Sequence, residues 1–150
     1  EYLFWFAKTE KFTINIDEMR VPYSESSLKR FKKPIKKRFN RTEGDEKVEY
    51  KDWGPNPKGA LPSTLINIGS ESKRISDNHI AVYPEQLTDY FIKGATNEGD
   101  FILDPFMGSG TTGVSAKKLK REWMGFDSIE EYVNFANKRI EKTKVNDKMS

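Results

Sequence analysis

The stretch Asp104-Pro-Phe-Met-Gly108-Ser-Gly110-Thr-Thr-Gly113 decides the fold of this 150-residue chain. It follows a short apolar run, residues 101–104, and precedes a segment of helical character over residues 110–121. Its three glycines fit the spacing G-x-G-x-x-G, which permits a tight turn and a close approach of the backbone to a ligand. The sequence therefore predicts a strand, a glycine turn and a helix in this order.

A second strand and a second helix are expected after the glycine turn. Residues 123–127 are predicted as the strand and residues 128–142 as the helix, with Glu130 and Glu131 in its first turn. Acidic side chains interact favourably with the helix dipole at that end. Two strands joined through a crossover helix pair in parallel. We therefore predict an α/β, Rossmann-like fold that contains part of a doubly wound sheet.

The ends of the two predicted strands carry acids that bear on the choice of ligand. Asp127 lies 19 residues after Gly108, where a carboxylate can accept hydrogen bonds from ribose hydroxyls. Asp104 would repel a pyrophosphate by several kcal/mol at short range, and it favours a ligand that carries an ammonium and a sulfonium. The turn also lacks the G-K-[ST] ending of a P-loop. The alternative is that Asp104 only caps the turn and the glycines only permit strand–helix packing.

The chain before the glycine turn is less regular. Residues 2–7 and 12–16 are predicted to form a hairpin, and a helix is predicted over residues 84–93 with Gly94 as its stop. The stretch between them is polar and rich in proline and glycine, which is typical of an inserted region. Its segment from residue 29 to residue 41 holds eight basic residues and no acidic one.

Composition excludes several classes of protein. No apolar run reaches the ~18–20 residues of a membrane span, so no membrane association is predicted. Without cysteine there can be no disulfide framework, and with one histidine no metal cluster is evident, so we predict no metal site. The balance of 26 basic against 23 acidic residues leaves a net charge of only +3, which makes the local basic block stand out.

Several spaced motifs resemble one known family. His79-Ile-Ala-Val-Tyr-Pro84-Glu-Gln-Leu87, Glu98–Thr112, Gly125-Phe-Asp127 and the pattern Glu131-Tyr132…Ala136…Arg139 look like the β-group of S-adenosylmethionine-dependent DNA amino-methyltransferases. The resemblance is clear over residues 78–140. It implies methyl transfer from S-adenosyl-L-methionine to cytosine N4 or adenine N6 in duplex DNA, as in restriction–modification systems, and a cytoplasmic location in a prokaryote.

The resemblance also implies roles for particular residues. The predicted cofactor-binding residues are Asp104, Pro105, Phe106, Gly108, Ser109, Gly110, Thr111, Thr112, Asp127, His79 and Tyr83. For His79 a structural hydrogen bond without a ligand is the equal alternative. Basic side chains that neutralise phosphates give salt-dependent DNA affinity, although a charged run is often only a solvated surface. The predicted DNA-binding residues are Lys29, Arg30, Lys32, Lys33, Lys36, Lys37, Arg38 and Arg41.

The family's catalytic motif, an Asp/Ser/Asn-Pro-Pro-aromatic tetrapeptide, has no counterpart here because the sequence contains no Pro-Pro pair. In this group the motif precedes the recognition region. We therefore predict no catalytic residue in this chain, and expect an N-terminal catalytic half to be supplied by the same parent chain or by another chain. Dimers are common in the family, so a homodimer is a further expected partner state.

These expectations divide the chain into four parts and leave two other functions open. Residues 1–16 would be late sheet strands, 17–77 the target-recognition region, 78–145 the cofactor part and 146–150 a tail. The first alternative function is an NAD(P)-dependent oxidoreductase domain, which Asp104 and the lack of a substrate domain oppose. The second is a non-catalytic DNA-binding or regulatory subunit with a remnant cofactor fold.

Overall fold

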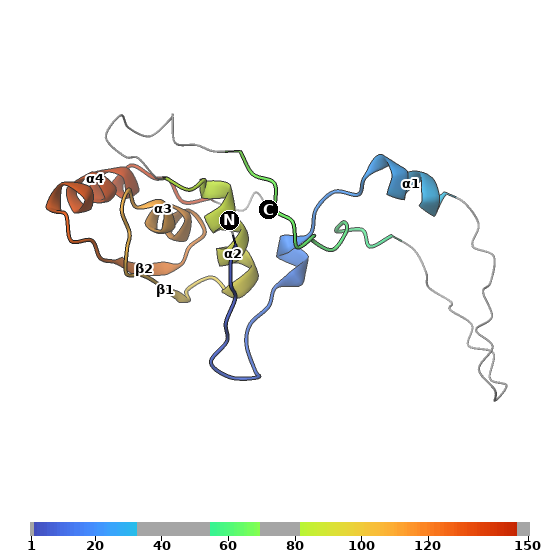
Figure 1. Ribbon diagram of the computed structural model, residues 1–150, viewed down its shortest axis with the longest axis horizontal. Helices are drawn as coiled ribbons and strands as arrows, with labels where there is room; N and C mark the ends of the chain where they lie inside the picture. The colour runs from blue at the N-terminus through green and yellow to red at the C-terminus, as the bar shows by residue number, and fades with distance from the viewer. Residues whose placement is uncertain (1, 33–54, 70–81, 147–150) are drawn as a thin grey trace. The chain divides into compact units, whose positions relative to one another are not determined.

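The structure, a computed structural model, describes residues 2–32, 55–69 and 82–146 (Figure 1). The chain forms two compact units. The first consists of Glu1–Met19 and Ser63–Ser150, and the second is the intervening Arg20–Pro62. The first unit contains the strands and helices around the glycine turn.

The predicted pair of parallel strands is confirmed. Strand β1 (Phe101–Asp104) pairs in parallel with β2 (Glu122–Gly125), and Asp104 lies opposite Gly125. Helix α3 (Thr111–Lys118) makes the crossover between them, so the Rossmann-like βαβ unit is present. Strand β2 ends before residue 127, and the amide of Phe126 donates to the Asp104 carbonyl at 2.9 Å where the ladder stops.

Helix α3 is shorter than the sequence predicts because its C-terminus closes in a Schellman motif. Lys120 adopts a left-handed conformation, with φ of 61°. The amide of Arg121 then donates to the Ala116 carbonyl at 2.8 Å, and that of Lys120 to the Lys117 carbonyl at 3.2 Å. These two bonds satisfy carbonyls at the end of the helix. Residues predicted as its last turn therefore lead directly into β2.

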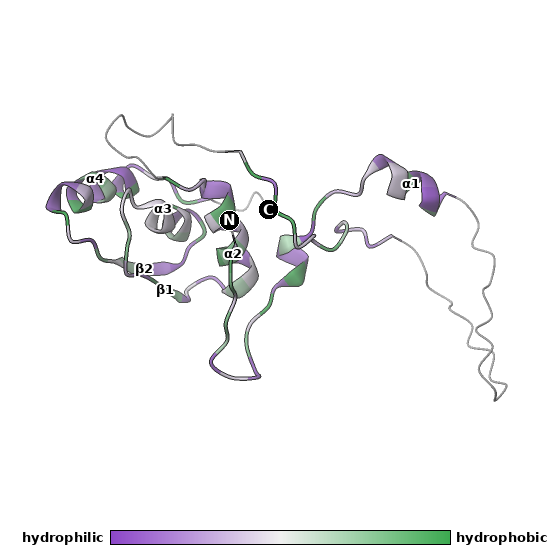
Figure 2. Cartoon of the chain, in the orientation of Figure 1, coloured by the Kyte–Doolittle hydropathy of each residue, from purple (hydrophilic) through white to green (hydrophobic). Residues whose placement is uncertain are grey.

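The core of the unit lies between β2 and the two last helices. Helices α3 and α4 (Glu130–Glu141) lie on the same side of the strands (Figure 1). Figure 2 shows α4 with both hydrophilic and hydrophobic strips, as an amphipathic helix requires. The buried side chains are Met107, Val114, Ala136 and Ile140, with Trp123 and Val133 packed against them. Helix α4 therefore packs on the core through the face that carries Val133, Ala136 and Ile140.

Gly113, the third glycine of the turn motif, belongs to this core. A Cβ atom there would lie 2.5 Å from Ile140 Cδ1 and 3.1 Å from Trp123 Cε3. We expect Gly113→Ala to cost about 1–3 kcal/mol of unfolding free energy, the usual penalty of overpacking a core. A urea midpoint equal to that of the unchanged protein, at an equal slope, would contradict this close packing.

The other face of the two strands is exposed and mostly apolar, with Glu122 as its one acid. Phe101, Leu103 and Met124 point to it and are 59%, 57% and 47% exposed. Contiguous apolar surface of this kind favours association. We expect the 150 residues alone to associate or to unfold without cooperativity in urea, measured by light scattering and circular dichroism. A monodisperse, cooperatively unfolding monomer would contradict that expectation.

Helix α2 (Glu85–Ala95) runs past the glycine expected to stop it. Gly94 lies inside the helix and is not among the glycines with a positive φ. A Cβ atom at this position would collide with Met19 of the 3₁₀ helix η1 (Ile16–Met19), so a residue without a side chain is needed there. The helix ends instead at Thr96, whose hydroxyl and amide both donate to the Ile92 carbonyl. Asn15 adds a side-chain bond of 2.9 Å to the Thr96 carbonyl. The predicted role of Gly94 as a stop is wrong, and close packing is its role.

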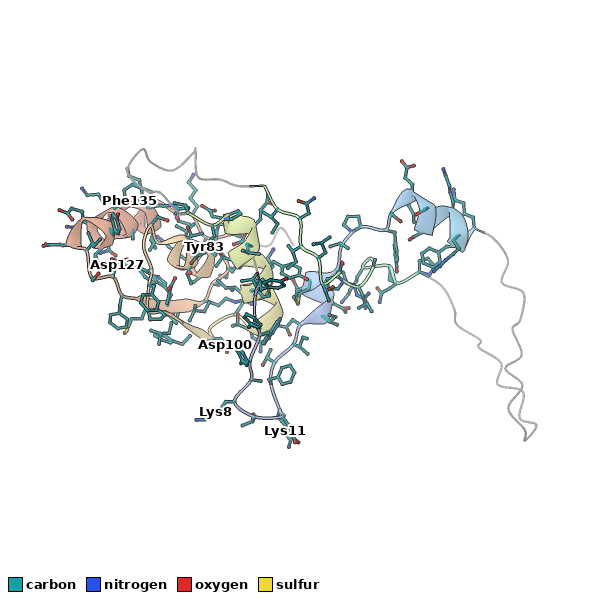
Figure 3. All side chains as sticks on the ribbon, viewed as in Figure 1. Lys8, Lys11, Tyr83, Asp100, Asp127 and Phe135 are labelled. Carbon is teal, nitrogen blue, oxygen red and sulfur yellow. The ribbon has the colours of Figure 1, made fainter. Side chains whose placement is uncertain are left out.

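The predicted N-terminal hairpin differs from the structure. Residues 2–7 and 11–15 are extended without strand pairing, and a bend over residues 8–10 connects them. Lys8 and Lys11 mark this bend in Figure 3. Most of the aromatic side chains remain exposed, with Tyr2 at 92% and Phe6 at 86%, whereas Trp5 packs edge-on against Phe91 at 5.9 Å. Strand-like composition is not sufficient for a sheet when the ladder bonds are not made.

The two ends of the second unit are joined by hydrogen bonds. Val21 and Ala60 form an antiparallel bridge, and the amide of Asn56 donates to the Tyr23 hydroxyl at 2.8 Å. Tyr23 also packs edge-on against Phe31, the last residue of helix α1 (Glu25–Phe31). Ser24 caps this helix by accepting from the amide of Ser27 at 3.2 Å. The unit lies inside the range 17–77 predicted as the recognition region.

Candidate functional site

The glycine turn is held by hydrogen bonds at both strand ends. After β1, the Asp104 carboxylate accepts from the amide of Phe106 at 3.0 Å, and after β2 the Phe126 carbonyl accepts from the amide of Met107 at 2.8 Å. Gly108 and Gly110 have φ of 49° and 78°, a conformation that glycine adopts at little cost. Gly110 also approaches Ala136 so closely that a Cβ atom would lie 2.8 Å from that methyl group. The glycines are thus required by the turn and by its packing on α4.

Asp127 fastens the turn to the end of β2. One carboxylate oxygen accepts from the amide of Gly108 at 2.9 Å and the other from the amide of Ile129 at 3.0 Å. A carboxylate has about four acceptor positions, so about two remain for a ligand. Asp127 can therefore position the turn and accept from hydroxyl groups at the same time.

A pocket of about 370 Å³ opens beside Asp127. It is lined by Pro105, Phe106, Phe126, Asp127 and Ser128. Its size lies in the range of ~300–1,000 Å³ found for small-molecule sites. It is placed outside the carboxyl ends of parallel strands, where open α/β sheets bind their ligands. Two aromatic side chains and one carboxylate suit a ligand that joins a flat ring to a polyhydroxyl group.

Tyr83 approaches the turn from the start of α2. Its hydroxyl lies 2.7 Å from Thr112 Oγ1 and 3.3 Å from Asp104 Oδ2. Although the ring is partly exposed, desolvation of the hydroxyl raises the pKa of Tyr83, the hydrogen bond with Thr112 lowers it in part, and the charge of Asp104 raises it further. Because the net shift is upward, the stability it contributes is present below the usual pKa of about 10 and is lost as the pH rises through the raised value.

Two cations and two acids connect the helices behind the turn. Glu85 pairs with Arg139 at 2.7 Å and with Lys118 at 3.3 Å, and Lys118 pairs with Asp89 at 3.0 Å. Burial lowers the pKa of Lys118, but hydrogen bonds and charge interactions with Asp89 and Glu85 outweigh it and leave the pKa raised. Arg139 reaches further and donates to the Ser109 carbonyl at 3.2 Å. The network therefore joins α2, α3 and α4 to the turn.

A protein-family model described as DNA methylase, N6_N4_Mtase, matches residues 1–138. The chain belongs to the DNA methylase family. This membership agrees with the family that the spaced motifs indicate.

Two curated relatives are about twice as long as this chain. The type II methyltransferase M1.MboII of Moraxella bovis is 35% identical over 97% of the chain and 55% of its own length. The orphan methyltransferase M.BamHII of Bacillus amyloliquefaciens is 34% identical over 93% of the chain and 53% of its own length. The chain thus spans about half the length of these relatives.

Solved structures match part of the chain. The M1.HpyAVI–SAM complex is 43% identical over 42% of this chain and 33% of its own, with a TM-score of 0.40. The cytosine-N4-specific PvuII DNA methyltransferase is 25% identical over 60% of this chain and 34% of its own, with a TM-score of 0.47.

The structure brings the described members of the predicted cofactor-binding set together at the turn. The pocket is lined by three of them, Pro105, Phe106 and Asp127. Two others, Asp104 and Tyr83, hydrogen-bond each other beside the start of the turn, a place that we call the turn mouth. The segment from Gly108 to Thr112 forms the turn and the start of α3, in which Ser109 and Thr111 are buried against Arg139. His79 lies outside the described residues.

The predicted DNA-binding residues are also only partly among the described residues. Lys29 and Arg30 occupy the last turn of α1, and Lys32 is its C-terminal cap. Figure 2 shows this end of the helix as hydrophilic. The remaining predicted residues, Lys33, Lys36, Lys37, Arg38 and Arg41, lie outside the described residues.

Four residues of this region have no role that the sequence predicts. Phe126 and Ser128 line the pocket but flank the acid rather than belonging to the glycine motif. Glu85 and Arg139 stand in the motifs that carry the resemblance, but no role is predicted for them. They are 54 residues apart in the chain, and the structure shows that their side chains form an ion pair. Among residues 2–32, 55–69 and 82–146, no group of three metal-ligating side chains comes together and no helix is long and apolar enough to cross a membrane.

Proposed function

We propose that this chain supplies cofactor binding and target recognition in a DNA amino-methyltransferase. The reaction transfers a methyl group from S-adenosyl-L-methionine to cytosine N4 or adenine N6 in duplex DNA. The observation that carries the proposal is the pocket beside Asp127, at the strand ends of a chain that belongs to the DNA methylase family. Family membership also removes the support for the oxidoreductase alternative.

The residues of the pocket fit S-adenosylmethionine. Phe106 and Phe126 offer apolar ring surfaces for an adenine, and the free acceptor positions of Asp127 suit ribose hydroxyls. Asp104 and the Tyr83 hydroxyl lie at the turn mouth, where a carboxylate favours the cationic end of the molecule over a pyrophosphate. The bound cofactor would supply the methyl group, and these residues would orient it.

DNA recognition is assigned to the second unit and its basic block. The described part of the block, Lys29, Arg30 and Lys32, ends helix α1. Cations at a helix C-terminus are favoured by the dipole and remain available for phosphate oxygens. The bridge between Val21 and Ala60 would present the intervening segment as one insertion with a closed base.

The catalytic group is proposed to come from outside these residues. A base that leaves the duplex must be stacked and its amino group held by acceptors, which the resemblance assigns to the Pro-Pro tetrapeptide. The sequence holds no Pro-Pro pair. The exposed apolar face formed by Phe101, Leu103 and Met124 is the surface that an additional part of the fold would cover. A homodimer remains a prediction.

The direct test is methyl transfer by the complete protein. It is incubated with mixed-sequence duplex DNA and methyl-labelled S-adenosylmethionine, and the digested nucleosides are identified by mass. We expect label in N4-methylcytosine or N6-methyladenine, and no label with the 150 residues alone. Unlabelled DNA with tightly bound cofactor would overturn the proposed transfer, and failure to bind the cofactor would overturn the cofactor site.

A further inference from the structure

Arg139 lies directly under the glycine turn. Its side chain is 15% exposed, and one nitrogen, Nη1, donates to the Ser109 carbonyl at 3.2 Å and to Thr111 Oγ1 at 3.1 Å. A longer contact of 3.4 Å reaches Ser109 Oγ. Ser109 and Thr111 are themselves 7% and 1% exposed. The two hydroxyls also lie 3.3 Å from each other, so Arg139 adds charged donors to a buried pair and to the Ser109 carbonyl.

The other arm of the guanidinium is fixed by an acid on a different helix. Arg139 Nη2 pairs with Glu85 Oε1 at 2.7 Å, and the fork geometry of arginine holds both arms in one plane. Glu85 begins α2, two residues after Tyr83, whose hydroxyl contacts Thr112 and Asp104. Arg139 therefore joins the underside of the turn to the element that contacts its mouth.

We propose that Arg139 is a positioning residue that sets the affinity of the turn for S-adenosylmethionine. The proposal rests on the proposed function. Arg139 donates hydrogen bonds to the Ser109 carbonyl and to the Thr111 hydroxyl. It does not line the pocket itself, whose lining residues are Pro105, Phe106, Phe126, Asp127 and Ser128. It acts by holding the Ser109 peptide and the first residue of α3 in place, so that the turn is already in its binding conformation.

The test is a steady-state comparison of Arg139→Met with the unchanged complete protein. We expect the KM for S-adenosylmethionine to rise about tenfold, because hydrogen bonds to a charged group are lost from the turn. The kcat and the KM for DNA should stay within about twofold, because the lost bonds orient the cofactor turn alone. A purely structural role would lower the folded fraction, and so the apparent kcat, without moving the KM for S-adenosylmethionine.

Lys118→Met is the matched control. Lys118 pairs with the same Glu85, but among the residues that the structure describes its side-chain nitrogen bonds only Glu85 and Asp89 and makes no bond to the turn. We expect this variant to lower the urea midpoint and leave the KM for S-adenosylmethionine unchanged. Arg139→Lys, which keeps the charge but loses the fork, should give an intermediate KM and serves as the deciding variant if Arg139→Met does not fold.

The outcomes separate this inference from the function on which it rests. If the unchanged protein does not use S-adenosylmethionine, the proposed function fails. If it does, and both Arg139 variants have its KM, the positioning role is overturned. An equal rise in KM for Lys118→Met would also overturn it, because the effect would then belong to the ion-pair network rather than to the bonds on the turn.

Discussion

Asp127→Ala is expected to weaken binding of S-adenosylmethionine by about 100-fold or more. The change removes the acceptors for the ribose hydroxyls, and each hydrogen bond to a charged group contributes about 1.5–3 kcal/mol. It also removes the hydrogen bond of 2.9 Å from the Gly108 amide to the Asp127 carboxylate. The turn is then less well ordered, and the cofactor loses its own hydrogen bonds to Asp127. Isothermal titration of the complete protein with S-adenosylmethionine measures the effect.

Asp100→Ala is the control for this first prediction. Asp100 is an exposed acid in the same unit, and its carboxylate accepts from the Asn97 amide at 2.7 Å. Figure 3 shows Asp100 near the end of α2, apart from Asp127. We expect cofactor affinity to stay within about twofold in this variant, since it loses one surface hydrogen bond and no pocket group. Equal affinities in the Asp127→Ala and Asp100→Ala variants would remove Asp127 from the cofactor site.

Neutralising the basic block should reduce DNA affinity and make it less sensitive to salt. Each phosphate contact contributes about −0.9 to the slope of log K against log salt for duplex DNA. Changing Lys29, Arg30 and Lys32 to Gln is therefore expected to flatten the slope by about 2–3, and changing all eight basic residues by up to about 7. Fluorescence anisotropy with duplex DNA at several salt concentrations measures both variants.

The matched control for the second prediction removes the same number of charges elsewhere. Lys138, Lys142 and Lys144 are exposed at the end of α4 and beyond it, in the unit that holds the cofactor pocket. Changing these three to Gln should leave the salt slope nearly unchanged. Cofactor affinity should be the same in every variant of this set. A slope that changes equally in the two triple variants would show a general charge effect and refute the assignment to the block.

Much of the candidate site could be predicted from local sequence. The strand over residues 101–104, the left-handed glycines and the acid after the next strand depend on neighbours in the chain. The parallel pairing follows from the crossover between consecutive strands, which permits few arrangements. These features need no knowledge of distant contacts, and this explains why the sequence indicates where a ligand would lie.

Other features depended on groups far apart in the chain. A glycine at position 94 predicts the end of a helix, but Gly94 packs against Met19 and the helix continues past it. Residues 2–7 have strand-like composition, but composition cannot supply the neighbouring strand whose hydrogen bonds make a sheet.

The bonds from Arg139 to Ser109 and Glu85 span 30 and 54 residues. No periodic pattern encodes such pairs. Local preference and spacing therefore settle the glycine turn and the order of its elements, whereas packing between distant segments decides which side chains support that turn.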